Sequence, residues 1–192
     1  MNKIIIDTDP GVDDLFAILL AGNSGELDIQ GICTVAGNCS LDYATKNAFK
    51  CLDLVNRQDV PVYQGMEKPM GAATEDASYV HGNNGMGDVS YPEIQRQTEP
   101  LHAVDFLLKA VNEHPNEITV VAIGPLTNIA YALQKDSDFL KKTKALIIMG
   151  GSTDAGNVTP YAEFNFYADP IAAKMVFDSE FSEIVMMGLN VT

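Results

Sequence analysis

The stretch Lys3–Asp14, KIIIDTDPGVDD, decides the class of fold. Its three consecutive isoleucines predict a short strand that is buried on both faces, because a half-exposed strand would show polar residues at alternate positions. The polar DTDPGVDD leads directly into Asp13–Ala21, a segment with helical period. A buried strand that passes through a polar turn into a helix is typical of a parallel sheet covered by helices.

The alternation of short apolar runs and helical segments continues along the chain. The runs expected to be strands are Lys3–Asp7, Ile29–Val35, Val60–Tyr63, Ile118–Ile123, Ala145–Met149 and Ile184–Met187. The segments expected to be helices are Asp13–Ala21, Leu41–Asn56, Leu101–Glu113, Leu126–Gln134 and Pro170–Asp178. Thr98 and Asp169 are expected to be helix N-caps, because a proline that fits the first helical turn follows each of them. The order predicts an α/β fold, a doubly wound, mostly parallel sheet with helices on both faces, and a single domain over residues 1–192.

The stretch Gly65–Pro92 interrupts this rhythm, because it shows neither helical nor strand period. It contains HGNNGMGD at His81–Asp88, and Gly, Met, Asn and Tyr dominate it. A long connection of this kind inside a compact domain is usually a lid or a binding loop, or else is disordered. Its apolar and aromatic residues argue against a solvated linker.

The chain is strongly acidic, with 12 Lys and Arg against 26 Asp and Glu and a formal net charge of −14. Such a surface repels nucleic acids and anionic membranes, because phosphate groups are bound by clustered cations. A neutral small molecule or a cation is therefore the expected partner. The N-terminus reaches Asp7 after three apolar residues, which leaves no signal-peptide core and favours a cytoplasmic location. Cys33, Cys39 and Cys51 lack metal-site spacing and are expected to be reduced thiols.

Polar side chains follow the expected strands at their carboxyl ends, where ligands bind in open parallel sheets. These ends carry oxygen-bearing side chains and glycines and no Lys, Arg or His: Asp7, Asp9, Asp13 and Asp14; Gly37 and Asn38; Gly124, Thr127 and Asn128; Gly150, Gly151, Asn157, Glu163 and Asn165; and Asn190. Carboxylate and amide oxygens suit a hard cation and a hydroxylated ligand, and they do not suit a phosphate.

The densest of these groups is Asp7–Asp14, which has four aspartates within eight residues. Like charges at that spacing destabilise the fold unless a cation neutralises them or two carboxylates share a proton. Calcium fits the group, because it takes about six to eight oxygen ligands. The alternative is that Asp13 and Asp14 serve the helix that follows as caps or dipole partners, although a cap needs only one side chain.

The run DTDPGVDD, Asp7–Asp14, resembles the signature of the inosine–uridine-preferring nucleoside hydrolase family, whose members are calcium-dependent ribonucleoside hydrolases. Further motifs follow in the family's order: VAGN at Val35–Asn38, HGNNGMG at His81–Gly87, GPLTN at Gly124–Asn128, MGG at Met149–Gly151 and GNVTPYAEFNFYADP at Gly156–Pro170. The resemblance covers essentially the whole chain, and its first and last motifs are long enough to be highly specific. It implies hydrolysis of the N-glycosidic bond of ribonucleosides to ribose and free nucleobase, in nucleoside catabolism or salvage.

The resemblance also implies a role for each matching position. Asp9 would help to bind Ca²⁺ and act as general base on the water that the ion activates. Asp14 and the main-chain carbonyl of Thr127 would be further calcium ligands. The other implied roles are binding of the ribose 2′- and 3′-hydroxyls by Asp13, Asn38 and Asn165, binding of the 5′-hydroxyl by Asn157 and Glu163, proximity to the base for His81, and orientation of the metal ligands by Asp7.

The implied chemistry agrees with the composition of the strand ends. Cleavage of a glycosidic bond builds positive charge on the ribose, and a pocket lined by carboxylates stabilises that charge. A free nucleoside has no phosphate, in agreement with the lack of cationic side chains. His81 alone would equally fit a solvent-exposed loop histidine, and His102 and His114 are interpreted as structural.

Members of the family continue well past Thr192. Their later part supplies another aspartate ligand of calcium and, in many members, a histidine associated with protonation of the leaving group. We therefore expect residues 1–192 alone to expose apolar surface at the open sheet, to bind calcium weakly and to hydrolyse nucleosides slowly or not at all. Dimers or tetramers are usual in the family, so a homo-oligomer is expected.

Two alternative functions remain open at this stage. Asp7-Thr8-Asp9 after an apolar strand is similar to the nucleophile motif of haloacid-dehalogenase-type phosphatases. However, Gly11 stands where that family has Thr or Val, and the strand ends offer no lysine. The other alternative is a catalytically impaired fragment or a non-catalytic riboside-binding protein, which would show no turnover even with calcium saturating.

Overall fold

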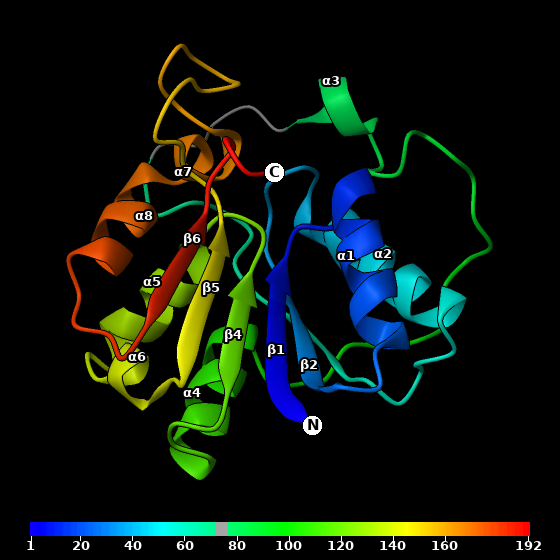
Figure 1. The fold of residues 1–192 in the computed structure, drawn as a ribbon. Coiled ribbons are helices and arrows are strands. Elements are labelled where there is room, and N and C mark those ends of the chain that lie inside the picture. Colours follow the sequence, from blue (N-terminus) through cyan, green and yellow to red (C-terminus); the bar gives the residue numbers. More distant parts are fainter. Residues whose placement is uncertain (72–76) are drawn as a thin grey trace.

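A six-stranded parallel sheet forms the centre of the computed structural model, which describes residues 1–71 and 77–192. The strands lie in the order β3-β2-β1-β4-β5-β6. β2, β1, β4, β5 and β6 can be followed side by side in Figure 1. Their bounds are β1 (Asn2–Thr8), β2 (Leu27–Thr34), β3 (Val62–Gln64), β4 (Thr119–Ala122), β5 (Ala145–Met149) and β6 (Ile184–Met187). Because the chain starts in the middle and winds outward in both directions, the sheet is doubly wound and the predicted fold class is confirmed.

Helices cover the two faces of the sheet unequally. Their bounds are α1 (Val12–Asn23), α2 (Leu41–Leu54), α3 (Ser78–His81), α4 (Ala103–Glu113), α5 (Thr127–Lys135), α6 (Phe139–Lys142), α7 (Phe164–Ala168) and α8 (Pro170–Phe177). On one face, Ile4 and Ile6 of β1 pack in a core with Ile18 of α1 and Phe49 of α2. On the other face, Ile5 packs in a larger core with α4, α5, α6 and α8.

The face that carries α1 and α2 has no helix of the described residues over β4, β5 and β6 (Figure 1). Side chains of β6 on this face are therefore open to solvent: Val185 is 37% exposed and Met187 is 38% exposed. Phe16 and Leu20, four residues apart on α1, are also exposed. No helix in the described ranges is long and apolar enough to cross a bilayer.

Most predicted element bounds agree with the structure, but one predicted N-cap is wrong. Asp169 caps α8 as predicted and accepts a hydrogen bond from the Ala172 amide at 3.0 Å. Thr98 does not cap a helix, because the neighbouring Glu99 amide donates to the Val62 carbonyl and keeps the chain extended along β3. The helix begins later, at Ala103, and its N-cap is His102.

The stretch Gly65–Pro92, which shows no periodicity in the sequence, contains some regular structure. Ser78–His81 form the single turn of α3, and tight turns follow, in which the Gly85 amide donates to Gly82 and the Gly87 amide to His81. Residues 72–76 of the same stretch lie outside the described residues. Three helices of four or five residues, α3, α6 and α7, are absent from the sequence-based prediction, because one turn is too short to show a helical period.

Candidate functional site

The carboxyl ends of β1, β2, β4 and β5 surround a cavity of about 500 Å³. Its lining includes seven of the ten predicted site residues: Asp13, Asp14, Asn38, His81, Asn157, Glu163 and Asn165. The other three, Asp7, Asp9 and Thr127, are buried side chains that do not belong to the lining. The sequence motifs, although far apart along the chain, therefore meet around one cavity.

Asp9 lies at the end of β1 and is completely buried. The Asn38 amide donates to its Oδ2 at 2.6 Å, while Oδ1 has no hydrogen-bond partner among the described residues. The backbone of Gly37 passes so close that a Cβ at this position would overlap with Oδ2. Burial raises the pKa of the Asp9 carboxyl well above its ordinary value, and the nearby negative charge of Asp14 raises it further.

Asp14, in the first turn of α1, is held in place by three donors. The Thr8 hydroxyl donates to Oδ1 at 2.6 Å, and the Gly11 amide and the Asn38 side-chain amide donate to Oδ2 at 3.0 and 3.1 Å. Burial and then the charge of Asp13 raise the pKa of Asp14 to about 7, although the bonds from Thr8 and Gly11 lower it. Asn38 thus binds Asp9 through its backbone and Asp14 through its side chain.

Asp7 lies deeper in the molecule and is also completely buried. Its Oδ2 accepts a bond of 2.7 Å from the Asn128 side chain, and its Oδ1 has no partner within the described part of the chain. Burial raises the pKa of Asp7 to about 7, against the lowering effect of the Asn128 bond. Asn128 also donates to the Thr34 carbonyl and accepts from the Met66 amide, so it joins β1, β2 and the segment after β3.

Thr127 begins α5, and its hydroxyl donates to Oδ2 of Asp169 at 2.7 Å. The same carboxylate oxygen accepts a bond from the Met70 amide at 2.9 Å, while Oδ1 caps α8. Asp169 is completely buried. One carboxylate therefore fixes the start of α5, the start of α8 and the segment that contains Met70.

Glu163 and Asn165 are held by the ends of β4 and β5. Asn165 donates its side-chain amide to the carbonyls of Ile123 and Met149, at 3.0 and 3.1 Å. Glu163 caps α7 and accepts bonds from the amides of Gly151, Asn165 and Phe166. Burial raises the pKa of Glu163 above its ordinary value, and these backbone bonds lower it. Asn157 is exposed at the rim of the cavity.

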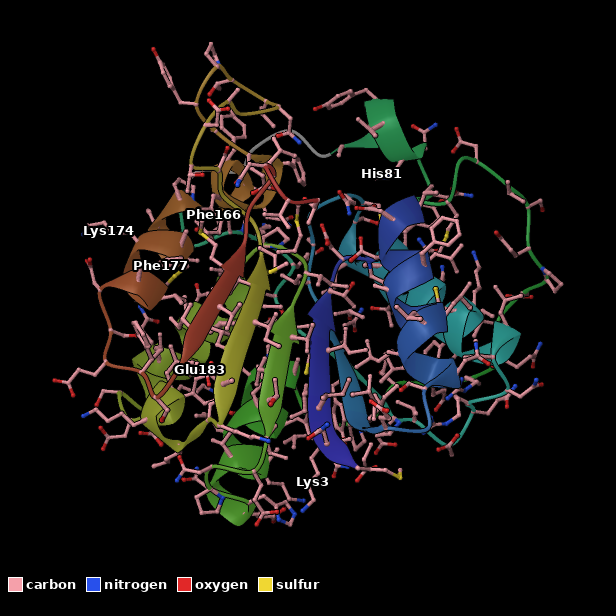
Figure 2. All side chains as sticks on the ribbon, viewed as in Figure 1. Lys3, His81, Phe166, Lys174, Phe177 and Glu183 are labelled. Atoms are coloured by element: carbon pink, nitrogen blue, oxygen red, sulfur yellow. The ribbon has the colours of Figure 1, made fainter. Side chains whose placement is uncertain are left out.

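His81, at the end of α3, forms the opposite wall of the cavity above the start of α1 (Figure 2). Its Nδ1 accepts a bond from the Val12 amide at 3.3 Å and lies 3.8 Å from Oδ1 of Asp13. The ring is mostly buried, since its side chain is 15% exposed. The alternative of a solvent-exposed loop histidine therefore does not describe its position.

A second cavity, of about 600 Å³, lies beside α7 and α8 and also includes Glu163 in its lining. Aromatic and aliphatic side chains dominate it: Tyr161, Phe166, Tyr167, Ile171 and Met186. It shares one residue with the predicted site. The first cavity is the better candidate because it collects carboxylate, amide and imidazole groups from separate motifs.

Asp9 and Asp14 could supply part of the coordination shell of a hard cation. Within the described residues no three His, Cys, Asp or Glu side chains form a complete metal site. Asp9 and Asp14 nevertheless bring two buried carboxylates near one another, and Oδ1 of Asp9 has no partner among the described groups. A calcium ion takes oxygen ligands, and carbonyls, waters and ligand hydroxyls can complete such a shell.

Three buried polar residues of the site region were not among the predicted site residues: Asn47, Asn128 and Asp169, the last of which was predicted only as a helix N-cap. Asn128 and Asp169 stand inside the motifs GPLTN and GNVTPYAEFNFYADP, so their position next to assigned residues was an available signal. Asn47 lies on α2 between the buried Ala44, Ala48 and Cys51. A polar residue on an otherwise apolar helix face was the available signal in that case.

Comparison with known proteins gives consistent matches over the chain. The family model described as inosine-uridine preferring nucleoside hydrolase matches residues 4–192. Uridine nucleosidase 1 of Arabidopsis thaliana is 46% identical over 100% of this chain and 57% of its own length. The non-specific ribonucleoside hydrolase RihC of Escherichia coli is 46% identical over 98% of this chain and 62% of its own length. A solved plant nucleoside hydrolase superposes with a TM-score of 0.94 at 42% identity, over 98% of this chain and 60% of its own.

Proposed function

Because the chain belongs to the inosine-uridine preferring nucleoside hydrolase family, we propose that it hydrolyses the N-glycosidic bond of ribonucleosides to ribose and free nucleobase. The chain spans between 57% and 62% of the length of the two curated relatives described above. The activity, the calcium ion and a homo-oligomeric, cytoplasmic state are therefore proposed for the protein.

One observation carries this proposal: seven residues from separate motifs line one cavity next to two buried carboxylates. The lining contains neither Lys nor Arg among the described residues, so it suits a neutral hydroxylated ligand better than a phosphate. Carboxylates and amides are the groups that bind the hydroxyls of a sugar. This composition also argues against the phosphatase alternative.

We assign the reaction to the residues as follows. Asp13, Asn38 and Asn165 bind the 2′- and 3′-hydroxyls of ribose, and Asn157 and Glu163 bind the 5′-hydroxyl. The carboxylates around the sugar stabilise the positive charge that develops on it as the glycosidic bond breaks.

Asp9 has the environment expected of the general base. It is buried, and burial raises the pKa of its carboxyl well above the ordinary value, so it is a stronger base than an exposed aspartate. Asp9 accepts the proton of the attacking water, and Asn38 and the Gly37 backbone keep its carboxylate in place. Asp9, Asp14 and the Thr127 carbonyl would hold Ca²⁺, which would supply positive charge to order the ribose hydroxyls and to make water easier to deprotonate.

A reducing-sugar assay on purine and pyrimidine nucleosides, with calcium and with chelator, tests the proposal. We expect ribose release that depends on calcium and that falls by about 10²–10⁴-fold in Asp9→Asn, the range that general-base catalysis contributes. Asp178→Ala, which removes an exposed carboxylate from the far end of α8, is the charge-matched control and should keep the wild-type rate.

The same samples separate hydrolysis from simple binding. No ribose from any nucleoside, together with calcium-dependent binding of nucleosides by calorimetry, would favour the non-catalytic riboside-binding alternative and contradict the proposed activity. Phosphate release from a generic phosphoester, without ribose release from nucleosides, would favour a phosphatase.

A further inference from the structure

Two segments that are distant in the sequence form facing walls of the candidate site. One is the aspartate loop, Asp7–Asp14, and the other is residues 78–88, which carry His81. They touch directly where His81 accepts the hydrogen bond from the Val12 amide. This contact is 3.3 Å long and exposed, so it is a weak tie between the two walls.

A stronger tie lies beneath the cavity, at Asn47 of α2. Its side chain is completely buried, and its Nδ2 donates to the Pro10 carbonyl at 3.0 Å and to the Asn84 carbonyl at 2.8 Å. Each acceptor lies 37 residues from Asn47, one on either side of it in the chain. The two protons of one side-chain amide therefore connect the aspartate loop to residues 78–88.

The backbone of Gly85 lies directly against this amide. Gly85 has φ +75°, and a Cβ at this position would lie 2.9 Å from Nδ2 of Asn47, 2.8 Å from Sγ of Cys39 and 3.1 Å from the Pro10 carbonyl oxygen. The glycine turn thus rests directly on Asn47 and Pro10. Met86, the next residue, is buried in the core with α1 and α2 and anchors the turn from the other side.

We propose that Asn47 is a positioning residue. Through its two hydrogen bonds it holds residues 78–88, which carry His81, in a fixed position relative to the aspartate loop. The inference rests on the proposed function, in which residues 78–88 lie near the nucleobase and the aspartate loop binds the sugar. Asn47 would keep these two walls aligned with one another. Asn47 does not line the cavity and is given no contact with the substrate. Its loss leaves the buried Pro10 carbonyl and the partly buried Asn84 carbonyl without that donor, and the turn can recover a hydrogen bond by moving towards water.

The first test is Asn47→Leu, which keeps the approximate shape of the side chain and removes both donors. The matched control is Thr45→Val, which removes a buried hydroxyl from the same helix. That hydroxyl bonds to Leu41 and Thr34, and neither belongs to the two walls. Amide hydrogen exchange reports opening of residues 78–88, and the NMR signals of the three imidazoles report the surroundings of His81, with His102 and His114 as internal references.

In Asn47→Leu we expect exchange of the Gly85 and Gly87 amides to rise by about 10-fold or more, the effect of losing buried hydrogen bonds. The His81 signals should shift while those of His102 and His114 stay in place. Thr45→Val should change neither. The proposal would be overturned if Asn47→Leu kept the amide exchange rates and the His81 signals of the wild-type protein. It would also be overturned if exchange rose equally in β1 and β2.

A kinetic measurement then distinguishes positioning from general support of the fold. We expect Asn47→Leu to raise the KM for nucleosides by about 10-fold, with little change in the constant for inhibition by free ribose, which occupies the sugar side alone. Equal changes in both constants contradict a positioning role. Exchange and NMR need no turnover, so an absence of hydrolysis in the wild-type protein would contradict the proposed function and leave the test of Asn47 intact.

Discussion

At the scale of single residues, the site is defined by buried carboxylates. Asp7, Asp9 and Asp14 are at most 4% exposed, and burial raises the pKa of each. A carboxylate in such surroundings either holds a proton or needs a cation nearby. The stability of the protein should therefore depend on pH and on calcium together.

We expect the free energy of unfolding of the calcium-free protein to fall as the pH rises from about 4 to about 7. The folded pKa values of Asp7 and Asp14, about 7, lie above the ordinary value of 3.8, so the folded state holds protons that the unfolded state has released. The loss should exceed about 1 kcal/mol, the order of magnitude that one pKa unit represents. Urea unfolding in chelator across this range measures it.

Two comparisons control for the general effect of net charge. Asp7→Asn should make the decline shallower, and saturating calcium should make it shallower in the wild-type protein. A free energy of unfolding that rises with pH in chelator over this range would contradict the prediction.

The predicted calcium ligand at Thr127 is its main-chain carbonyl. A substitution of the Thr127 side chain can therefore shift this ligand without removing any carboxylate. Thr127→Val removes the hydroxyl that bonds to Asp169 and loosens the start of α5. We expect calcium affinity to fall by about 10-fold, as for other residues that orient a ligand, and stability to fall by about 1 kcal/mol. Thr143→Val removes a similar buried hydroxyl, which donates to Phe139, and should lower stability without changing the calcium titration measured by calorimetry.

Residues of conspicuous chemistry can be identified from the sequence more readily than the residues that hold them in position by hydrogen bonds. Four aspartates in eight residues are conspicuous in any sequence. Asn47 and Asp169 are single polar residues in helical surroundings, and their importance depends on acceptors and donors from other segments. Such pairings are set by the tertiary fold, which local sequence patterns do not contain.

At the scale of elements, the start of α4 shows how tertiary contacts override a local signal. Thr98 followed by Pro100 is a sequence pattern typical of a helix start. However, the Glu99 amide donates a hydrogen bond to the Val62 carbonyl of β3, so the helix does not begin there. His102 then caps the helix, and its Nδ1 accepts from the Val104 amide at 3.2 Å. The long apolar strands and helices could be predicted because their period spans several turns or alternations, whereas α3, α6 and α7 are too short for one.

This difference in N-caps can be measured by urea unfolding. His102→Ala should lower the free energy of unfolding by about 1 kcal/mol, the usual cost of a lost cap, whereas His102→Ser should retain most of it. Thr98→Ala should change it by less than about 0.5 kcal/mol. If Thr98→Ala lowered the free energy of unfolding more than His102→Ala did, Thr98 and not His102 would be the N-cap, as the sequence predicted.

At the scale of the whole molecule, the uncovered face of β4, β5 and β6 is the main departure from a sheet that is closed on both sides. Val185 and Met187 present apolar groups there, and contiguous apolar surface of this kind promotes association. We expect the chain to associate in a concentration-dependent way in sedimentation velocity, and the double variant Val185→Lys with Met187→Lys to shift it towards monomer.

Leu54→Lys is the control, because Leu54 is 58% exposed at the end of α2, away from this face. It should leave the association unchanged. A monomeric wild-type chain at all concentrations, or an equal effect of Leu54→Lys, would show that the β6 face does not drive association.

The strand order also determines when the site can form as the chain is made. β1 pairs with β2, the next strand along the chain, but its other edge pairs with β4, which is synthesised much later and in which Thr119 lies opposite Ile4. Asp9, Asp14 and Asn38 are therefore synthesised well before Thr127, Glu163 and Asn165, the site residues on the other side of β1. During that interval the strand carries its carboxylates beside an open hydrogen-bonding edge, which is free to pair with another nascent chain. The central position of β1 therefore makes β4, its late partner, the strand that protects β1 from pairing with another chain.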